Sequence, residues 1–172
     1  GSNSTSGTAS NLSAGSYSVS VTDKNQCKSG ASFRLIDPLK VTLEVKDSIR
    51  CYGERGQIMA HAVGGEPSSV GLPYSYTLHQ IVGETDTPLN LSDSIALNLP
   101  EGYYQIEVAD TKGRELKSEM LHLTQPDPLQ IEVDAHNVTC KGDGNGSVHL
   151  SAKGGNGGYT YFWNDGVVGA DR

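Results

Sequence analysis

The side chains that could do chemistry in this sequence are five histidines and one glycine-rich acidic segment. The segment KGDGNGS at 141–147 resembles a calcium-binding loop, but the bidentate glutamate at the twelfth position is absent, so we interpret it as a tight turn. No nucleophile elbow, zinc-binding HExxH, phosphate loop or dinucleotide fingerprint is present. We therefore predict no enzyme activity, no cofactor and no metal site. The histidines are isolated in sequence and are interpreted as polar surface or packing residues: His61, His79, His122, His136 and His149.

The elements that must hold these side chains are arranged as an internal repeat. LSAGSYSVSVTD at 12–23 aligns with LPEGYYQIEVAD at 99–110, at an offset of 87 residues. The segments 37–65 and 127–155 both begin with DPL and end with a glycine pair, at an offset of 90. Self-similarity at this spacing indicates structural units of about 90 residues.

A further match extends the repeat, because PYSYTL at 73–78 aligns with GYTYFW at 158–163. We predict three units from these matches. Residues 1–37 form the C-terminal half of a preceding repeat, residues 38–126 one complete repeat, and residues 127–172 the N-terminal half of a following repeat.

Within each unit, apolar residues alternate with polar ones in short segments bounded by Gly, Pro, Asn or Asp, and this pattern predicts strands. The composition agrees, since 21 glycines and 7 prolines argue against long helices. Six or seven antiparallel strands in 90 residues indicate an all-β fold of tandem immunoglobulin-like or fibronectin-like β-sandwiches. For the complete repeat we expect strands at 40–46, 57–63, 73–82, 93–98, 103–109 and 116–124.

Aromatic residues at matched positions favour the same fold. Tyr17 and Tyr104 are the candidates for a tyrosine corner, in which a Tyr early in the penultimate strand folds back onto the preceding chain. Trp163 stands where such a sandwich places a core Trp, and the complete repeat has Leu78 there. We interpret these side chains as structural.

The last strand of the repeat admits two alignments. Matching Phe33 with Met120 would turn His122 inward, whereas a shift of one residue exposes Met120 and buries Leu121 and Leu123. We favour the shifted register.

Charge and hydropathy exclude two classes of partner. The net charge of −7 provides no basic stripe for a nucleic-acid backbone. No apolar run approaches the roughly 18 to 20 residues that a membrane helix needs, and the N-terminus lacks a signal pattern. We expect neither nucleic-acid binding nor membrane insertion.

The order of motifs resembles a known family. GxYxVxVTDxxxC, a Pro-Leu junction, VxCxGxxxGxxxxxxxGG and an aromatic YxYxW are similar to the SprB repeats of very large surface proteins of Bacteroidota. Two positions depart from the pattern, because the complete repeat has Arg114 in place of the hairpin cysteine and Leu78 in place of the tryptophan. The resemblance implies an extracellular or cell-surface adhesin, exported by type IX secretion and related to gliding motility.

Two functions are compatible with this resemblance. Small sandwiches joined by short Pro-containing links would form a semi-rigid stalk or filament, because proline restricts the joints. Alternatively, the repeat is a module that binds a surface glycan or protein through the long loops at EPSSVGLPY and VGETDTPLN, which belong to the complete repeat.

Two covalent features are also expected. The three cysteines permit at most one disulfide, and we take Cys27 and Cys51 as the candidate pair with Cys140 free, although two strands separate the pair. Ser48 and Ser94 each follow Asp and precede Ile, and so resemble the O-glycosylation acceptors of Bacteroidota.

The two half-repeats predict a partner. Each would leave unpaired strand edges and half a core exposed. We expect the missing half to come from neighbouring repeats of the same polypeptide or from another copy of the chain, by half-domain complementation.

Overall fold

The computed structural model describes residues 7–171 and is built only of β-strands and their connections within that range. Every strand pairing is antiparallel. The predicted all-β fold class is therefore confirmed. Over the described residues, no helix exists that would be long and apolar enough to cross a membrane.

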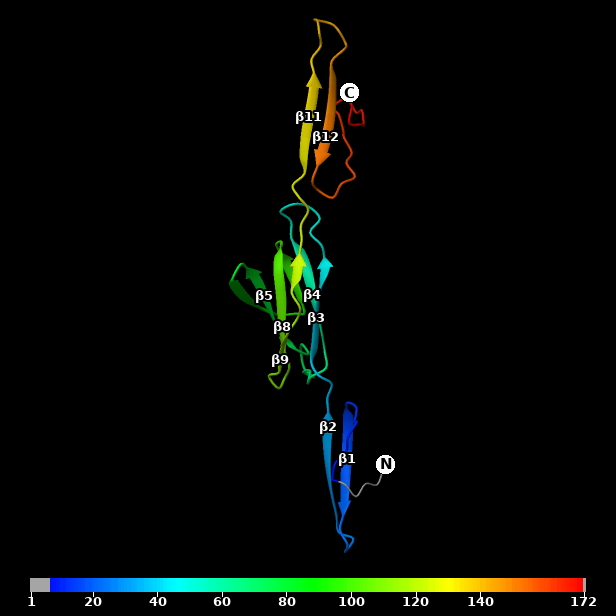
Figure 1. Ribbon diagram of the computed structural model, residues 1–172, viewed down its shortest axis with the longest axis vertical. Helices are drawn as coiled ribbons and strands as arrows, with labels where there is room; N and C mark the ends of the chain where they lie inside the picture. The colour runs from blue at the N-terminus through cyan, green and yellow to red at the C-terminus, as the bar shows by residue number, and fades with distance from the viewer. Residues whose placement is uncertain (1–6, 172) are drawn as a thin grey trace.

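The strands form three groups placed end to end (Figure 1). The first is the N-terminal hairpin of β1 (Gly15–Thr22) and β2 (Lys28–Leu35), and the last is the C-terminal hairpin of β11 (Gln130–His136) and β12 (Ser147–Lys153). Residues 38–126 lie between them and are called the central sandwich.

The central sandwich consists of two sheets. One has the order β3-β4-β7; the other has the order β10-β8-β5-β6, with β9 also pairing β8. The strands of the first sheet are β3 (Lys40–Asp47), β4 (Gly56–Val63) and β7 (Ile95–Leu99). Those of the second are β5 (Ser75–Val82), β6 (Thr85–Leu91), β8 (Gly102–Ala109), β9 (Glu115–Lys117) and β10 (Leu121–Leu123).

Alternation along β8 builds much of the core. Tyr104, Ile106 and Val108 point inward and are 0%, 1% and 0% exposed. Tyr104 packs with Ile58 of β4, in the opposite sheet. Burial of alternate residues from both sheets is the packing of a β-sandwich, and it supplies most of the stability of such a small domain.

The last strand adopts the favoured register. Leu121 pairs with Tyr104, and Leu123 pairs with Gly102, whereas Met120 is exposed. Leu123 is 1% exposed, so the shift of one residue is confirmed. The strand is interrupted at residues 118–120, where the Ile106 N–H donates to the Ser118 hydroxyl over 3.1 Å, and this break separates β9 from β10.

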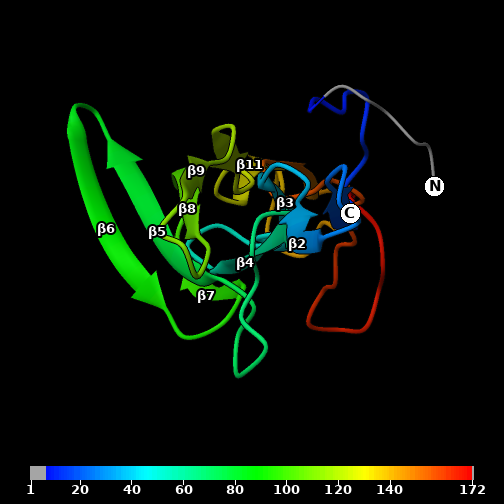
Figure 2. The same ribbon diagram turned by 90° about the horizontal axis from the view of Figure 1, so that it is seen from below.

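One strand differs from the expectation. The segment expected to be the long loop VGETDTPLN contains β6, which pairs along β5 from Val82↔Thr85 to Tyr76↔Leu91. Figure 2 shows this hairpin projecting from the body of the sandwich. Pro88 is accommodated because β6 is an edge strand, where a missing N–H costs no ladder hydrogen bond.

Candidate functional site: the joint between repeats

The chain enters the central sandwich through a close backbone contact, which we call the first joint. Asp37 and Pro38 lie against Gly64 and Gly65, and the Gly65 N–H donates to the Asp37 carbonyl over 2.9 Å. Gly64 has a φ of 79°, and a Cβ on it would stand 2.1 Å from the Pro38 oxygen. Both the backbone angle and the space therefore require glycine.

The second joint has the same construction. The Gly155 N–H donates to the Asp127 carbonyl over 2.8 Å. Gly154 has a φ of 80°, and a Cβ there would again stand 2.1 Å from the proline oxygen, that of Pro128. Two joints 90 residues apart thus fix the entering chain in the same way.

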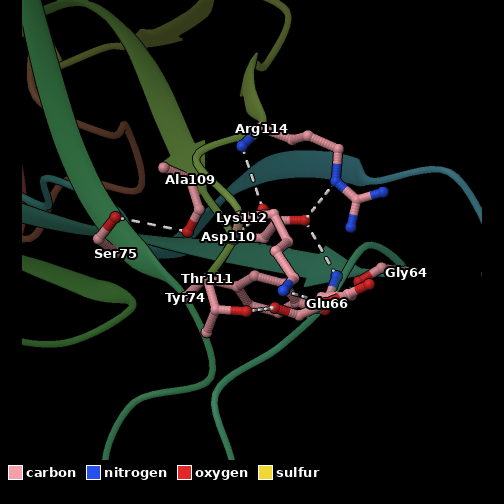
Figure 3. A network of polar contacts seen from close by, with 9 residues as sticks. All are labelled: Gly64, Glu66, Tyr74, Ser75, Ala109, Asp110, Thr111, Lys112 and Arg114. Atoms are coloured by element: carbon pink, nitrogen blue, oxygen red, sulfur yellow. Dashed lines mark hydrogen bonds and ion pairs between the residues drawn. The ribbon is translucent and has the colours of Figure 1, made fainter.

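A buried carboxylate braces the first joint (Figure 3). Asp110 follows β8, and its side chain is fully enclosed. Its Oδ1 accepts the N–H groups of Lys112 and Arg114 over 2.9 and 3.0 Å. Its Oδ2 accepts the Glu66 N–H over 3.0 Å and Arg114 Nε over 2.7 Å. Asp110 therefore ties the turn after β8 to the chain that leaves the glycine pair.

The hydrogen bonds decide the charge of this group. Burial alone would raise the pKa of Asp110, but the donors from Glu66, Arg114 and Lys112 lower the pKa to about 2. The carboxylate is the form that these N–H groups stabilise. The brace is therefore ionised at neutral pH.

Two further contacts hold the loop that begins at Glu66. The Thr111 N–H and hydroxyl both donate to the Glu66 carbonyl, over 3.1 and 2.8 Å. The Tyr74 hydroxyl donates to the Gly64 carbonyl over 2.7 Å. The second joint carries the same tyrosine contact, since the Tyr159 hydroxyl donates to Gly154 over 2.6 Å.

The side chain of Asn156 makes a hydrogen bond across the second joint. Asn156, directly after the glycine pair, donates through Nδ2 to the Arg50 carbonyl over 2.6 Å. The C-terminal hairpin is thereby attached to the loop between β3 and β4 of the central sandwich.

The two candidate corner tyrosines make equivalent contacts. The Tyr104 hydroxyl donates to the Pro100 carbonyl over 2.9 Å, and the Tyr17 hydroxyl donates to the Ser13 carbonyl over 2.7 Å. Each partner lies four residues upstream. The two differ in burial, because Tyr104 is enclosed in the core and Tyr17 is only partly covered.

The disulfide expected between Cys27 and Cys51 does not form. Both thiols and that of Cys140 are free and exposed. Cys27 precedes β2 and Cys51 follows β3, and these two eight-residue strands run in succession along the molecule (Figure 1). At about 3.3 Å per residue they separate the two cysteines by roughly 50 Å, far beyond the reach of a disulfide.

The proposed glycosylation sites are placed differently. Ser48 is exposed after β3. Ser94 is half-buried before β7, its N–H donates to Asp93, and its carbonyl accepts the Ala60 N–H. Ser48 is therefore the more accessible of the two hydroxyls.

One histidine is packed more tightly than its isolated position in the sequence indicates. His79 is 7% exposed, and its Nδ1 lies 2.8 Å from Asp86 Oδ1. Its Nε2 is 3.4 Å from Glu107 Oε2 without hydrogen-bond geometry. The partners come from the strands on either side of β5, so only the sheet register reveals the cluster.

The segment at 141–147 closes on its own side chains. Asn145 Oδ1 accepts the Thr139 N–H over 3.1 Å, and the Thr139 hydroxyl donates to Asp143 over 2.9 Å. The Asp143 N–H donates to the Cys140 carbonyl over 3.1 Å. These contacts describe a hydrogen-bonded turn between β11 and β12.

The loop expected to bind a ligand is short and closed. In EPSSVGLPY, the Ser68 N–H donates to the Pro73 carbonyl over 2.7 Å, and the Ser68 hydroxyl contacts Val70. The other expected loop contains β6. A groove of about 600 Å³ lies elsewhere, between the β3–β4 loop and the C-terminal hairpin. Among the residues that line it are Tyr52, Leu129, Ile131, Ala152, Tyr159 and Tyr161.

The comparison with known proteins agrees with part of this picture. Residues 133–168, which cover most of the C-terminal hairpin and the aromatic segment after it, match the SprB repeat family. This segment is therefore similar to an SprB repeat, the kind of repeat that the motifs of the chain resemble. No curated protein and no solved structure matches the chain significantly.

The glycine pairs and the Asp-Pro links were visible in the sequence, but their contact was not. Asp110 and Glu66 are 44 residues apart, and their hydrogen bond depends on how the turn after β8 reaches the end of β4. The only sequence signal for the joint was that both of its halves recur together at an offset of 90 residues.

Proposed function

We propose that this chain is a structural and adhesive segment of a large secreted cell-surface adhesin, in which β-sandwich repeats form a semi-rigid stalk. The observation that carries the proposal is the joint, built in the same way at Gly64–Gly65 and at Gly154–Gly155. At each joint the hydrogen bond and the proline hold the Asp-Pro link against the unit that follows it, so fewer torsions of the link remain free to bend.

Several features support a passive mechanical role. The three groups of strands follow one another along one axis (Figure 1). The SprB match supports a location at the cell surface. No catalytic step is assigned to the chain, whose repeats serve the secreted, adhesive parent protein as its spacer.

Small-angle X-ray scattering of the monomer at low concentration tests the stalk. Three tiers of seven or eight residues, each about 23 to 26 Å long, together with two joints give a rod of roughly 90 Å. Such a rod has a radius of gyration of about 26 Å, against about 16 Å for a compact chain of this length. A compact value, or one that only a broad ensemble of bent shapes fits, would overturn the stalk.

The cell-surface location needs its own test. Antibodies against the central sandwich should stain intact cells of the source organism, and protease added to intact cells should remove the signal. Staining that requires permeabilised cells would place the protein inside and contradict the proposal.

A further inference from the structure

The N-terminal hairpin exposes the residues that are buried in the central sandwich. Val19 and Val21 of β1 correspond to Ile106 and Val108 of β8, at the offset of 87 residues. The two valines are 48% and 65% exposed, whereas Ile106 and Val108 are 1% and 0% exposed. The hairpin therefore exposes an apolar face whose counterpart is buried in the central sandwich.

The turns confirm that this correspondence is structural. Asp23 Oδ1 accepts the N–H groups of Asn25 and Cys27, both over 2.8 Å. The matching oxygen of Asp110 accepts those of Lys112 and Arg114. The β1–β2 hairpin thus has the local geometry of β8 and the strand after it.

The C-terminal hairpin has the opposite half of the same core. Leu129, Ile131, Ala152, Tyr159 and Tyr161 line the groove of about 600 Å³. Their counterparts pack in the central sandwich against Ile106 and Val108 of β8. Those counterparts are Leu39, Val41, Ala62, Tyr74 and Tyr76. The groove is therefore the space that a β8-like strand fills.

Two segments form strands only where their partners are present. Residues 95–99 are β7 and pair with β4, whereas the matching residues 8–12 form no strand. Residues 75–82 are β5 and pair with β8, whereas the matching residues 160–167 contain only one isolated bridge, at Phe162. In each case the pairing strand belongs to the other half of a repeat.

We propose that the N-terminal hairpin of one molecule docks into this groove of a second copy of the chain and completes a sandwich. Val19 and Val21 fill the groove, residues 160–167 pair with β1, and residues 8–12 pair with β12. Asp23 of one copy then accepts the Asn156 N–H of the other, as Asp110 accepts the Glu66 N–H in the central sandwich.

The position of the hairpins determines the assembly. They lie at opposite ends of the molecule (Figure 1), so each copy offers one hairpin and one groove to different neighbours. Such a heterologous contact extends into an open head-to-tail chain. Charge favours the contact, since residues 7–37 have three basic and two acidic side chains, and residues 127–171 have two basic and six acidic ones.

Two blocking variants of the full chain test the proposal. Val19→Glu places a charge on the docking face of the hairpin, and Ile131→Glu places one in the groove. Both residues are about half exposed or more, at 48% and 60%, so each substitution leaves the free molecule folded. Leu97→Glu, at a residue 58% exposed on β7, is the matched control.

Sedimentation velocity from micromolar to millimolar concentration provides the measurement. The wild type and the Leu97 variant should grow in mass with concentration, while each blocking variant alone stays a monomer of 18.2 kDa. An equimolar mixture of the two blocking variants should form a dimer that grows no further, because one intact hairpin meets one intact groove. Hydrogen exchange at 160–167 should slow in that dimer and in the wild-type assembly, but in neither blocking variant alone.

Three outcomes would overturn the proposal. The wild type could stay monomeric throughout, which would leave the two faces to neighbouring repeats of one polypeptide. A blocking variant could still associate with itself, which would indicate a different surface. The mixture could stay monomeric although circular dichroism shows both variants folded.

Discussion

Substitution of Gly64 by alanine is the most direct perturbation of the first joint. Alanine at a φ of 79° costs about 1 to 2 kcal/mol, and part of this is offset because alanine restricts the unfolded chain. The new Cβ would lie 2.1 Å from the Pro38 oxygen, so the joint must open. Opening breaks the hydrogen bond from the buried Gly65 N–H to Asp37, at about 1 to 3 kcal/mol.

The expected loss of unfolding free energy is therefore about 2 to 4 kcal/mol. Gly53→Ala is the matched control, because Gly53 has a φ of 81° and nothing within 4 Å of the position of its Cβ. The Gly53 variant has only the cost of the positive φ and should lose about 1 kcal/mol of unfolding free energy.

Urea unfolding of the full chain, followed by tyrosine fluorescence or circular dichroism, measures both variants under the same conditions. The informative quantity is the difference between the two losses of unfolding free energy. It should be at least about 1 kcal/mol, which corresponds to a factor of about five or more in the unfolding equilibrium constant. Equal losses would refute the reasoning, since they would mean that the proline carbonyl does not approach Gly64.

Three other predictions concern residues away from the glycine pairs. The pKa of Asp110 is about 2 in the folded protein against an ordinary 3.8, so the stability that its carboxylate contributes is complete above pH 3.8 and is lost as the pH falls towards 2. Asp110→Asn should remove this part of the acid sensitivity in thermal melts. An unchanged pH profile would contradict the role of the Asp110 carboxylate in bracing the joint. Tyr104→Phe should lower the free energy of unfolding in urea by about 1 to 2 kcal/mol, because it leaves the Pro100 carbonyl without its donor. Tyr17→Phe should lower it by less than about 0.5 kcal/mol, because Tyr17 is partly exposed. Equal losses would argue against a buried tyrosine corner at Tyr104. An unreduced native sample should react with a thiol reagent at all three cysteines, Cys27, Cys51 and Cys140. Reaction at only one cysteine would indicate that the other two form a disulfide.

The strands that alternate cleanly were predictable from sequence. Tyr104, Ile106 and Val108 mark β8 by period two, and the shifted register followed from the choice between burying His122 and burying Leu123. The edge strand β6 was missed because Pro88 and its polar neighbours are typical of a loop, and only the position at the sheet edge makes them acceptable in a strand.

The contacts of the joint could not be predicted from the sequence, for a different reason. The glycine pair and the Asp-Pro link form a joint only when β3 and β4 pair in the register Lys40↔Val63, which places their backbones in contact at the next residues. The disulfide expected between Cys27 and Cys51 was wrong for the same reason. The two cysteines are near one another in the sequence, but the sequence does not specify the direction of the strands on either side of the joint.

The direction of the chain through the central sandwich determines how it would respond to pulling. The chain enters at the end next to the N-terminal hairpin and leaves at the opposite end, so tension is applied along the strands (Figure 1). The first strand, β3, is paired with β4 from Lys40↔Val63 to Asp47↔Gln57. A pull along β3 loads these hydrogen bonds together in shear, whereas a pull across the sheet would open them one after another. The central sandwich is therefore oriented to resist a force applied between its two ends along the strands.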